Sequence, residues 1–397
     1  MTHIEQMIQD MCPNGVEFKT LGEVCEMKRG STITANQAED GDIPVIAGGQ
    51  KPAYFHNQSN REGKNITVAG SGAYAGYVAY WEQPIFVSDA FTVTPKEAFL
   101  DIKFVYYFLT NIQDKIYHTK KGSGVPHVHP SSIADFEIPL PPLEIQKKIV
   151  ECLDKFSALA AELQAELQMR RKQYEYYRTQ LLTPHSDCNS ADNTDDAQWE
   201  WKTLGEIGEM IKGSGIQKSD FVEEGKPCIH YGQVHTFYGT FAYKNKSYIS
   251  EELYAKCKKA HTGDLVIATT SEDVEACCKA TAWLGDEDVA VSGDAHIYRH
   301  TQNPKYMAYL FQTEMFAQQK RRCATGAKVT RVHGDDMLKF RFPLPSLAEQ
   351  ERIVSILDKF EALTTSLSDG IPAEQAAQQK LYEYYRDLLL TFDRKAV

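Results

Sequence analysis

The segment Pro139-Leu-Pro-Pro-Leu-Glu-Ile-Gln-Lys-Lys-Ile-Val-Glu-Cys-Leu-Asp-Lys-Phe156 decides the fold, because it opens a long helical pattern and returns later in the chain. Its second copy is Pro343-Leu-Pro-Ser-Leu-Ala-Glu-Gln-Glu-Arg-Ile-Val-Ser-Ile-Leu-Asp-Lys-Phe360. Two other blocks recur in the same order: Lys19-Thr-Leu-Gly-Glu-Val24 as Lys202-Thr-Leu-Gly-Glu-Ile207, and Tyr174-Glu-Tyr-Tyr-Arg178 as Tyr382-Glu-Tyr-Tyr-Arg386. The chain is therefore a tandem duplication with a period of about 200 residues.

The helical blocks carry apolar residues at alternating steps of four and three, the period of a coiled coil. Prolines at 139–142 and at 184 delimit a first helix of about 39 residues, or ~58 Å. Gly370 and Pro372 predict a break in the second copy near 369–372. We expect the two copies to pair antiparallel; the alternative is that each packs only on its own domain. The pairing residues are Ile149, Leu153, Phe156, Leu163, Leu167, Ile353, Leu357, Phe360 and Leu367.

Between the repeated blocks lie two diverged modules that mix short apolar runs with glycine and polar turns. Strands are expected at 66–69, 77–81, 85–87, 91–94, 265–268, 289–291 and 297–298, and helices at 104–116 and 306–319. The predicted class is α+β: two globular modules in a pseudo-two-fold arrangement, separated by two long antiparallel helices. The expected divisions are a first module at 1–142, its helical region at 143–184, an acidic linker at 185–197, a second module at 198–346 and its helical region at 347–397.

The composition indicates an ordinary globular protein of a reducing compartment. Nine cysteines without a Cys-x-x-Cys pair are typical of free thiols. The sequence starts with no pattern of a signal peptide, and no run of 18 apolar residues occurs. We therefore expect a cytoplasmic protein with no membrane contact.

The net charge of −11 argues, taken alone, against a protein coated in nucleic acid. Locally the sign reverses: residues 320–341 hold seven Lys or Arg against two Asp, and the matching place in the first module is also basic. Basic loops with small residues suit phosphate contact, although a solvated loop without a ligand is the alternative. The Gly-rich turn at 70–76 and its counterpart at 269–273 could present hydroxyls to base edges or be ordinary turns.

The predicted DNA contacts follow from these loops. In the first module they are Ser71, Tyr74, Lys115, Lys120, Lys121, Ser123, His127 and His129. In the second module they are Thr269, Thr270, Ser271, Lys320, Arg321, Arg322, Lys328, Arg331 and His333. Two histidines at 127 and 129 are too few ligands to predict a metal.

Both Tyr-Glu-Tyr-Tyr-Arg blocks end a predicted helix with aromatics beside the seam. Exposed tyrosine and arginine are frequent anchors of protein interfaces, and tyrosines in a core are the alternative. The predicted docking residues for a partner subunit are Tyr174, Tyr176, Tyr177, Arg178, Tyr382, Tyr384, Tyr385 and Arg386.

The motifs of catalysis are missing: there is no Asn/Asp-Pro-Pro-aromatic motif, P-loop, helicase motif or His-Glu-x-x-His. We therefore predict no catalytic residue and no cofactor in this chain. A fused nuclease or methyltransferase with an unrecognised site, and a protein-only scaffold whose modules bind protein partners, are the competing hypotheses.

The order of repeated blocks resembles the specificity (S, or HsdS) subunit of type I restriction–modification enzymes over essentially the whole chain. The resemblance implies that each module is a target recognition domain that reads one half of a bipartite double-stranded DNA site. It implies two modification subunits that use S-adenosylmethionine to methylate adenine, and restriction subunits that use ATP and Mg²⁺ for cleavage. The helical regions would then set the spacing of the half-sites.

Overall fold

A computed structural model describes residues 3–122, 124–183, 199–326, 329–365 and 370–395. It divides into two compact units: unit 1 is Met1–Ala165 with Ala373–Val397, and unit 2 is Glu166–Pro372. The division falls within the helical regions, so each unit holds one diverged module together with parts of both helical regions. None of the described helices combines the length and the apolar character that crossing a bilayer requires.

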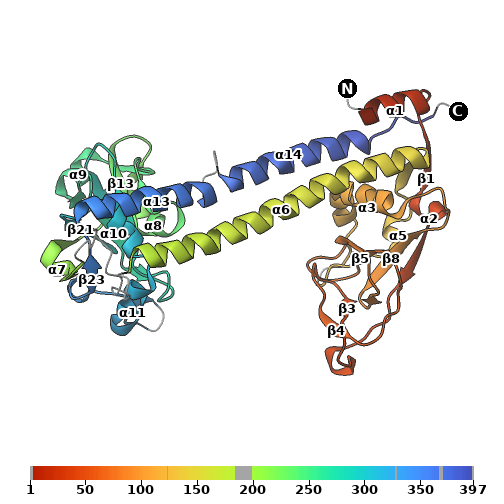
Figure 1. Ribbon diagram of the computed structural model, residues 1–397. Helices are drawn as coiled ribbons and strands as arrows, with labels where there is room; N and C mark the ends of the chain where they lie inside the picture. The colour runs from red at the N-terminus through yellow and green to blue at the C-terminus, as the bar shows by residue number, and fades with distance from the viewer. Residues whose placement is uncertain (1–2, 123, 184–198, 327–328, 366–369, 396–397) are drawn as a thin grey trace, which may run out of the picture. The chain divides into compact units, whose positions relative to one another are not determined.

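Unit 1 is built on a four-stranded antiparallel sheet next to a three-stranded mixed sheet (Figure 1). The first sheet has the order β2 (Cys25–Arg29), β8 (Ala90–Pro95), β5 (Asn65–Ala69), β6 (Val78–Trp81). The second has the order β4 (Tyr54–His56), β3 (Ile43–Ile46), β7 (Phe86–Val87), with β3 and β7 parallel. All four strands predicted in this module are present, with bounds shifted by one residue or so.

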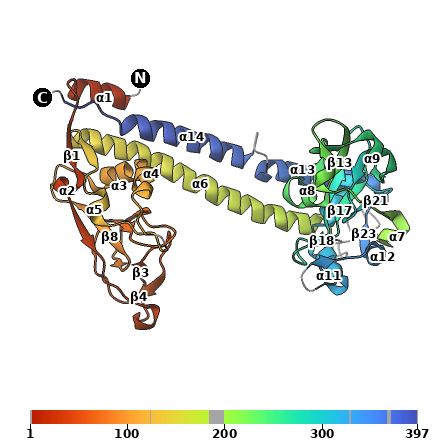
Figure 2. The ribbon, with the colours of Figure 1, turned by 180° about the vertical axis from the view of Figure 1, so that it is seen from behind.

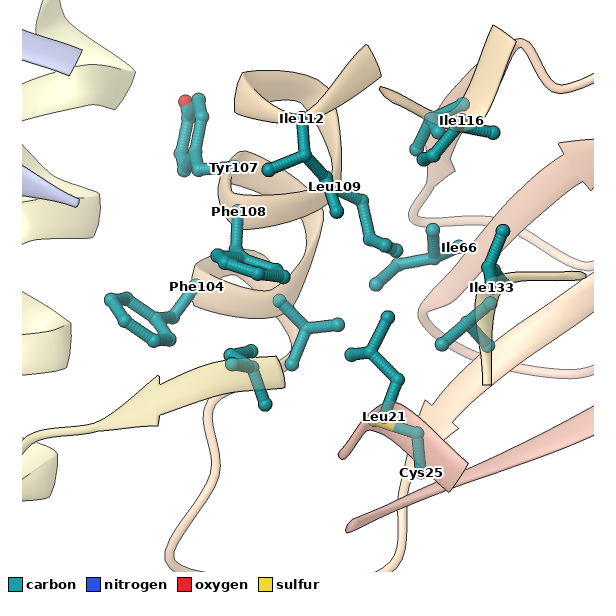
Figure 3. Close-up of a cluster of buried hydrophobic side chains, with 14 of the residues drawn as sticks. Leu21, Cys25, Ile66, Phe104, Tyr107, Phe108, Leu109, Ile112, Ile116 and Ile133 are labelled. Carbon is teal, nitrogen blue, oxygen red and sulfur yellow. The ribbon is translucent and has the colours of Figure 1, made fainter. Parts of the chain in front are cut away.

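The short helices of unit 1 contribute to its core. They are α1 (His3–Met11), α2 (Leu21–Val24), α3 (Ile102–Asn111), α4 (Gln113–His118) and α5 (Pro130–Ile133). Leu109 of α3 points toward Ile66 of β5, whereas Phe104 points away from it on the other side of α3 (Figure 3). Both belong, with Phe108 and Leu21 of α2, to one cluster of buried residues. The single helix predicted over 104–116 is wrong, because Ile112 leaves the helical conformation (φ −96°, ψ 19°) and α4 starts after it.

Unit 2 contains two five-stranded sheets. One has the order β11 (Gly208–Lys212), β21 (Ala295–His300), β17 (Leu265–Ala268), β19 (Lys279–Trp283), β14 (Phe241–Ala242). The other has the order β12 (Phe221–Val222), β15 (Ser247–Ile249), β13 (Lys226–Ile229), β20 (Val289–Val291), β16 (Lys259–Ala260). The three strands predicted in this module are confirmed.

The remaining short elements of unit 2 surround these sheets. The helices are α7 (Leu204–Ile207), α8 (Tyr231–Thr236), α9 (Glu251–Lys256), α10 (Pro304–Leu310), α11 (Glu314–Cys323) and α12 (Gly334–Met337). The helix predicted over 306–319 is wrong, because it divides at 311–313 into α10 and α11. Thr313 caps the start of α11 by accepting a hydrogen bond from the Phe316 amide.

The repeated blocks pair with each other and close each module. In unit 1, β1 (Glu17–Thr20) pairs antiparallel with β9 (Glu137–Leu140). In unit 2, β10 (Glu200–Thr203) pairs in the same way with β23 (Arg341–Leu344). The start and the end of each module are therefore neighbours, and the long helix leaves from that point.

The first helical region is one continuous helix, α6 (Leu143–Leu181), of 39 residues, as predicted. Gln146 in its first turn is fully buried: its Oε1 accepts from the Asp101 amide at 2.8 Å and its Nε2 donates to the Pro141 carbonyl at 2.8 Å. Gln350, at the matching place in α13 (Leu347–Thr365), accepts from the Asn303 amide at 3.0 Å and donates to the Pro345 carbonyl at 3.0 Å. The recurring glutamine thus fixes the helix to its module.

A second recurring contact follows about two helical turns later. Asp154 of α6 accepts from the Lys103 ammonium at 2.9 Å and from the Tyr107 hydroxyl at 2.6 Å. Asp358 of α13 accepts in the same way from Lys305 at 2.5 Å and Tyr309 at 2.7 Å. The starts of both helices therefore belong to the modules as much as to the helix pair.

The second helical region consists of α13 and α14 (Ile371–Leu389), which confirms the predicted break. Within unit 1, α14 lies beside the first half of α6 in both views (Figures 1 and 2). Phe156 packs against Tyr385 at 5.6 Å, and Gln375 donates to Gln164 at 3.1 Å. Because 156 meets the later residue of α14 and 164 the earlier one, the pairing is antiparallel, as predicted.

The same pairing recurs in unit 2, where Tyr174 and Tyr177 of α6 pack against Phe360 of α13 at 6.4 and 5.4 Å. Most of the predicted seam is buried; Leu367 lies outside the described residues. The buried members are Ile149, Leu153, Leu163, Leu167, Ile353 and Leu357.

The seam is not uniformly apolar. In unit 1 a cavity of about 580 Å³ lies between α6 and α14 where Ala160 and Ala376 leave room, and Gln164, Gln375 and Gln379 line it.

The first and last segments of the chain meet in unit 1. The Val16 amide donates to the Asp393 carbonyl at 2.8 Å, and the Lys395 amide donates to the Val16 carbonyl at 2.9 Å. Arg394 also forms an ion pair with Glu137 of β9. Val16 and residues 393–395 therefore lie side by side.

Candidate nucleic-acid interface

In unit 1 the two loops predicted to touch DNA form one hydrogen-bonded surface. Lys121 and His127 exchange backbone hydrogen bonds at 3.0 and 2.8 Å, which makes a small hairpin. Ser71, which follows β5, bridges to His127, and the Gly72 amide donates to the Pro126 carbonyl at 3.0 Å. Side chains about 50 residues apart in sequence therefore share one face.

The exposed side chains of this surface are polar, aromatic and basic. Tyr74 is 48% exposed, and Lys115, Lys121, His127 and His129 are exposed. The rings of His127 and His129 stack at 6.0 Å. Such groups can donate to phosphates and to base edges, which fits the prediction. Ser123 lies outside the described residues.

Lys120 is less free than its neighbours. Its ammonium lies 4.3 Å from the centre of the Tyr117 ring and donates to the Ala73 carbonyl at 3.3 Å. This lysine links α4 to the turn at 70–76, so its first role in this structure is to support the surface.

Unit 2 repeats this arrangement. Thr270 and Ser271 form β18, which pairs antiparallel with β22 (Thr330–Arg331), and Thr325 bridges to Arg331. Arg331 therefore occupies the place of His127, and Thr270 the place of Ser71. Figure 2 shows β18 beside α11 in this unit.

Both hairpins turn on a glycine that no other residue could replace cheaply. Gly122 has φ +112° and Gly326 has φ +109°, and a Cβ would lie 2.6 Å from the Val125 carbonyl oxygen and 2.1 Å from that of Val329. When the sequences of the two modules are compared with each other, Gly326 aligns with Gly124. The structure shows instead that Gly122 holds the matching position in unit 1.

Several residues of unit 2 that were predicted to contact DNA are buried. Lys320 is 4% exposed, and its ammonium donates to the carbonyls of Glu275 at 2.8 Å and Cys277 at 3.0 Å. The prediction of a phosphate contact at Lys320 is therefore wrong in this structure, because this face of α11 packs inward. Thr269 and Thr270 are also buried, so their hydroxyls do not face a base edge.

Arg321 is exposed but not free, since it forms ion pairs with Glu275 at 2.9 Å and Glu314 at 2.6 Å. Arg322, Arg331, Ser271 and His333 remain at or near the surface, and Lys328 lies outside the described residues. The basic surface of unit 2 is thus smaller than the sequence suggested.

Sequence reasoning missed one basic residue in each unit. The Arg29 guanidinium at the end of β2 lies 3.1 Å from Nδ1 of His129. Lys212 ends the matching strand β11, and burial first, then the charges of Lys212 and His333, lower the pKa of His296. Arg29 and Lys212 could have been found from the sequence, because each ends the strand that follows a Leu-Gly-Glu block.

A groove of about 810 Å³ adjoins this surface in unit 2. Its lining includes Tyr231, His235, Ser271, Lys279 and Val329. No group of three or more His, Cys, Asp or Glu side chains suited to a metal occurs among the described residues. The arrangement offers recognition chemistry, namely donors, acceptors and aromatic faces.

The tyrosines of the Tyr-Glu-Tyr-Tyr-Arg blocks divide into those that pack on the neighbouring helix and the middle ones, which do not; Tyr177, which packs, is still 39% exposed. Tyr382 and Tyr385 pack on Phe156, as Tyr174 and Tyr177 pack on Phe360. The middle tyrosines are exposed, Tyr176 by 60% and Tyr384 by 63%. Arg178 and Arg386 lie over the rings of Tyr174 and Tyr382 at 5.1 and 5.7 Å.

The comparison with protein families identifies one match. The family described as the type I restriction modification DNA specificity domain matches residues 13–169 and 197–375. Both matched segments contain one diverged module and helical residues that follow it.

Two relatives with a curated description match over nearly their full length. The specificity subunit of the type I restriction enzyme EcoR124I/EcoR124II of Escherichia coli is 29% identical over 99% of this chain and 98% of its own. The putative type I specificity subunit S.HindORF215P of Haemophilus influenzae is 29% identical over 98% of both chains.

Solved structures share the fold. The S subunit of a type I restriction–modification system from M. genitalium superposes with a TM-score of 0.59 at 17% identity, over 95% of this chain and 96% of its own. A chain from a study of the assembly and conformational transition of the type I system gives 0.57 at 18% identity, over 95% and 98%.

Proposed function

The chain belongs to the type I restriction–modification DNA specificity family, and from this premise we propose that each of its two modules reads one half of a bipartite DNA site. The observation that carries the proposal is the duplicated hairpin surface, His127 with Ser71 in unit 1 and Arg331 with Thr270 in unit 2. The backbone is the same and the side chains differ, as expected of two readers with different targets.

The proposal assigns the chain no catalytic step. Two modification subunits would bind it and use S-adenosylmethionine to methylate adenine N6, which requires the base to leave the stack. Restriction subunits would add cleavage with ATP and Mg²⁺. We place this complex in the cytoplasm. The helical regions would set the number of base pairs between the half-sites.

Methylation of a random DNA library tests the proposal. The full chain, purified with its modification subunits, is incubated with S-adenosylmethionine, and the methylated adenines are sequenced. We expect two short motifs separated by a fixed number of unspecified base pairs. Methylation without a motif, or a single uninterrupted motif, would contradict the proposal.

The exposed tyrosines give a separate test of subunit docking. Tyr176→Ala or Tyr384→Ala should weaken binding of a modification subunit by about tenfold, because exposed aromatics are typical anchors. Arg171→Ala is the matched control for Tyr176→Ala, since it is exposed on α6 and lies five residues away, on a different face. Equal losses for the control and Tyr176→Ala would argue against docking here.

A further inference from the structure

Two adjacent cysteines lie beneath the hairpin of unit 2. Cys277 and Cys278 directly precede β19, each is 1% exposed, and their Sγ atoms are 3.8 Å apart. Both line the groove of about 810 Å³ that also reaches Ser271 and Val329. The pair thus borders the predicted DNA surface without being part of its outer face.

The backbone at this pair is unusual. Cys278 has φ +64° and is the one non-glycine residue at positive φ among the described residues. Its amide donates to the Ala268 carbonyl at 2.8 Å, as the amide of Gly76 (φ +87°) donates to the Ala69 carbonyl at 2.7 Å in unit 1. Unit 1 therefore has Ala75-Gly76 where unit 2 has Cys277-Cys278, and unit 2 keeps a side chain where glycine is the unstrained choice.

The surroundings favour reactivity at Cys277. A hydrogen bond from the Cys278 thiol, with help from the Lys320 ammonium, lowers the pKa of Cys277 despite its burial. The Lys320 ammonium is held there by the carbonyls of Glu275 and Cys277. A thiolate is the form of cysteine that attacks electrophiles, and its neighbour is close enough to complete a second bond.

We propose that Cys277 and Cys278 form a vicinal dithiol site for trivalent thiophilic compounds of the arsenous class, and that its occupation weakens the reading of DNA by unit 2. In the reaction R–As=O accepts both thiols. Two S–H bonds break and two As–S bonds form, the two protons leave with the arsenical oxygen as water, and no atom changes its oxidation state.

The Thr269 carbonyl connects the cysteine pair to the predicted DNA surface. Cys277 Sγ lies 3.2 Å from the Thr269 carbonyl oxygen, to which its thiol donates, and the Val332 amide donates to the same oxygen at 3.2 Å. Thr269 precedes β18, and Val332 follows β22. Because arsenic replaces the thiol hydrogen, the bridge removes one of the two donors to the Thr269 carbonyl, which directly precedes β18 and also accepts from the residue after β22. This second half of the inference rests on the proposed function.

Phenylarsine oxide is the probe for the site, applied to the full chain with its modification subunits. We expect one equivalent to bridge the peptide that contains 277 and 278, to resist excess glutathione and to be released by 2,3-dimercaptopropanol. Cys277→Ala/Cys278→Gly gives unit 2 the residues of unit 1 and should lose the adduct, whereas Cys152→Ala, a half-buried thiol of α6, should keep it. Peptide mapping of the unaltered chain decides the question even if the double variant fails to fold; an adduct elsewhere overturns the site.

Binding to duplexes with one mutated half-site tests the link. The adduct should reduce discrimination at the half-site of unit 2 by roughly fivefold, the loss of about one hydrogen bond, and leave that of unit 1 unchanged. Adduct formation with both half-sites still distinguished overturns the link and leaves the proposed function standing. A complex that distinguishes neither half-site before treatment overturns the proposed function instead.

Discussion

At the residue scale, the two hairpins place different side chains on the same backbone arrangement. His127 and Arg331 occupy the same bridge position, and each faces a different neighbour at the end of a strand, Ser71 or Thr270. A histidine and an arginine differ in charge and in the number of donors, so the same frame presents different chemistry to a groove.

Arg331→Ala should reduce discrimination at one half-site only. Arg331 is exposed and only loosely paired with Asp294 at 3.8 Å, so its removal costs little stability and about tenfold in specificity. Competition binding of the assembled complex to duplexes with either half-site mutated measures this. Arg352→Ala, an exposed arginine paired with Glu349 on α13, is the control. A uniform loss at both half-sites would show that Arg331 acts only on the fold.

Acid should destabilise unit 2 through His300. Burial lowers the pKa of this side chain to about 4, and its Nδ1 accepts from the Gln302 amide at 3.2 Å. Below pH 6.5 the imidazole binds a proton in the unfolded state but stays neutral in the folded state. The free energy of unfolding therefore falls as the pH drops from 6.5 toward 4. Between pH 7 and 5 the parent should lose about 2 kcal/mol more than His300→Asn.

Hydrogen exchange of the amides of β17 and β21 at both pH values measures this difference within unit 2. The asparagine keeps an acceptor for the Gln302 amide and removes the titration. An equal loss in the parent and in His300→Asn would assign the acid sensitivity to other groups.

At the element scale, the starts of α6 and α13 are the best-defined features. A buried glutamine, an aspartate and a Lys–Tyr pair recur at equal positions, so each long helix is fixed to its module before it meets its partner helix. The alternative of helices packed only on their modules is thus partly correct: the first turns do so, and the later turns pair.

Gln146→Ala should destabilise unit 1 by roughly 2–3 kcal/mol, because it leaves the Asp101 amide and the Pro141 carbonyl buried without this partner. Chemical unfolding followed by circular dichroism measures the shift. Gln164→Ala on the same helix removes an exposed hydrogen bond to Gln375 and should cost less than about 0.5 kcal/mol. Similar midpoints for the two variants would refute the role of Gln146.

Repeats and periodicity predicted the elements well, since the α6 bounds, the break in the second helical region and the core strands follow from local pattern. The tertiary surroundings of single side chains could not be predicted from these local patterns. Lys320 is buried because its face of α11 packs inward, and a single sequence gives no sign that a lysine will lie beside two carbonyls. Arg29 was missed because the residue that it contacts, His129, lies 100 residues away in the sequence.

At the scale of the whole molecule, the net charge of −11 describes an average over parts with different roles. The candidate surfaces are small and carry few free cations, since Lys320 is buried and Arg321 is paired. Net charge is therefore a poor guide to whether such a chain meets DNA.

The isolated chain should bind DNA weakly and lose that binding between about 50 and 200 mM salt, because a few phosphate contacts supply most of its affinity. Fluorescence anisotropy with a labelled duplex measures this, with the complex that includes modification subunits as the comparison. Tight binding by the isolated chain at 200 mM salt would contradict the small charged surfaces described above.

The hydrogen bonds of Val16 with Asp393 and Lys395 bear on the order in which the two modules can follow each other in the sequence. A peptide that joins residue 395 to residue 3 would allow a chain that starts near residue 199 and places the second module first. Every strand pair and helix pair described within the units would keep its partners. A circularly permuted chain of this kind should therefore keep both modules and, under the proposed function, the same DNA site.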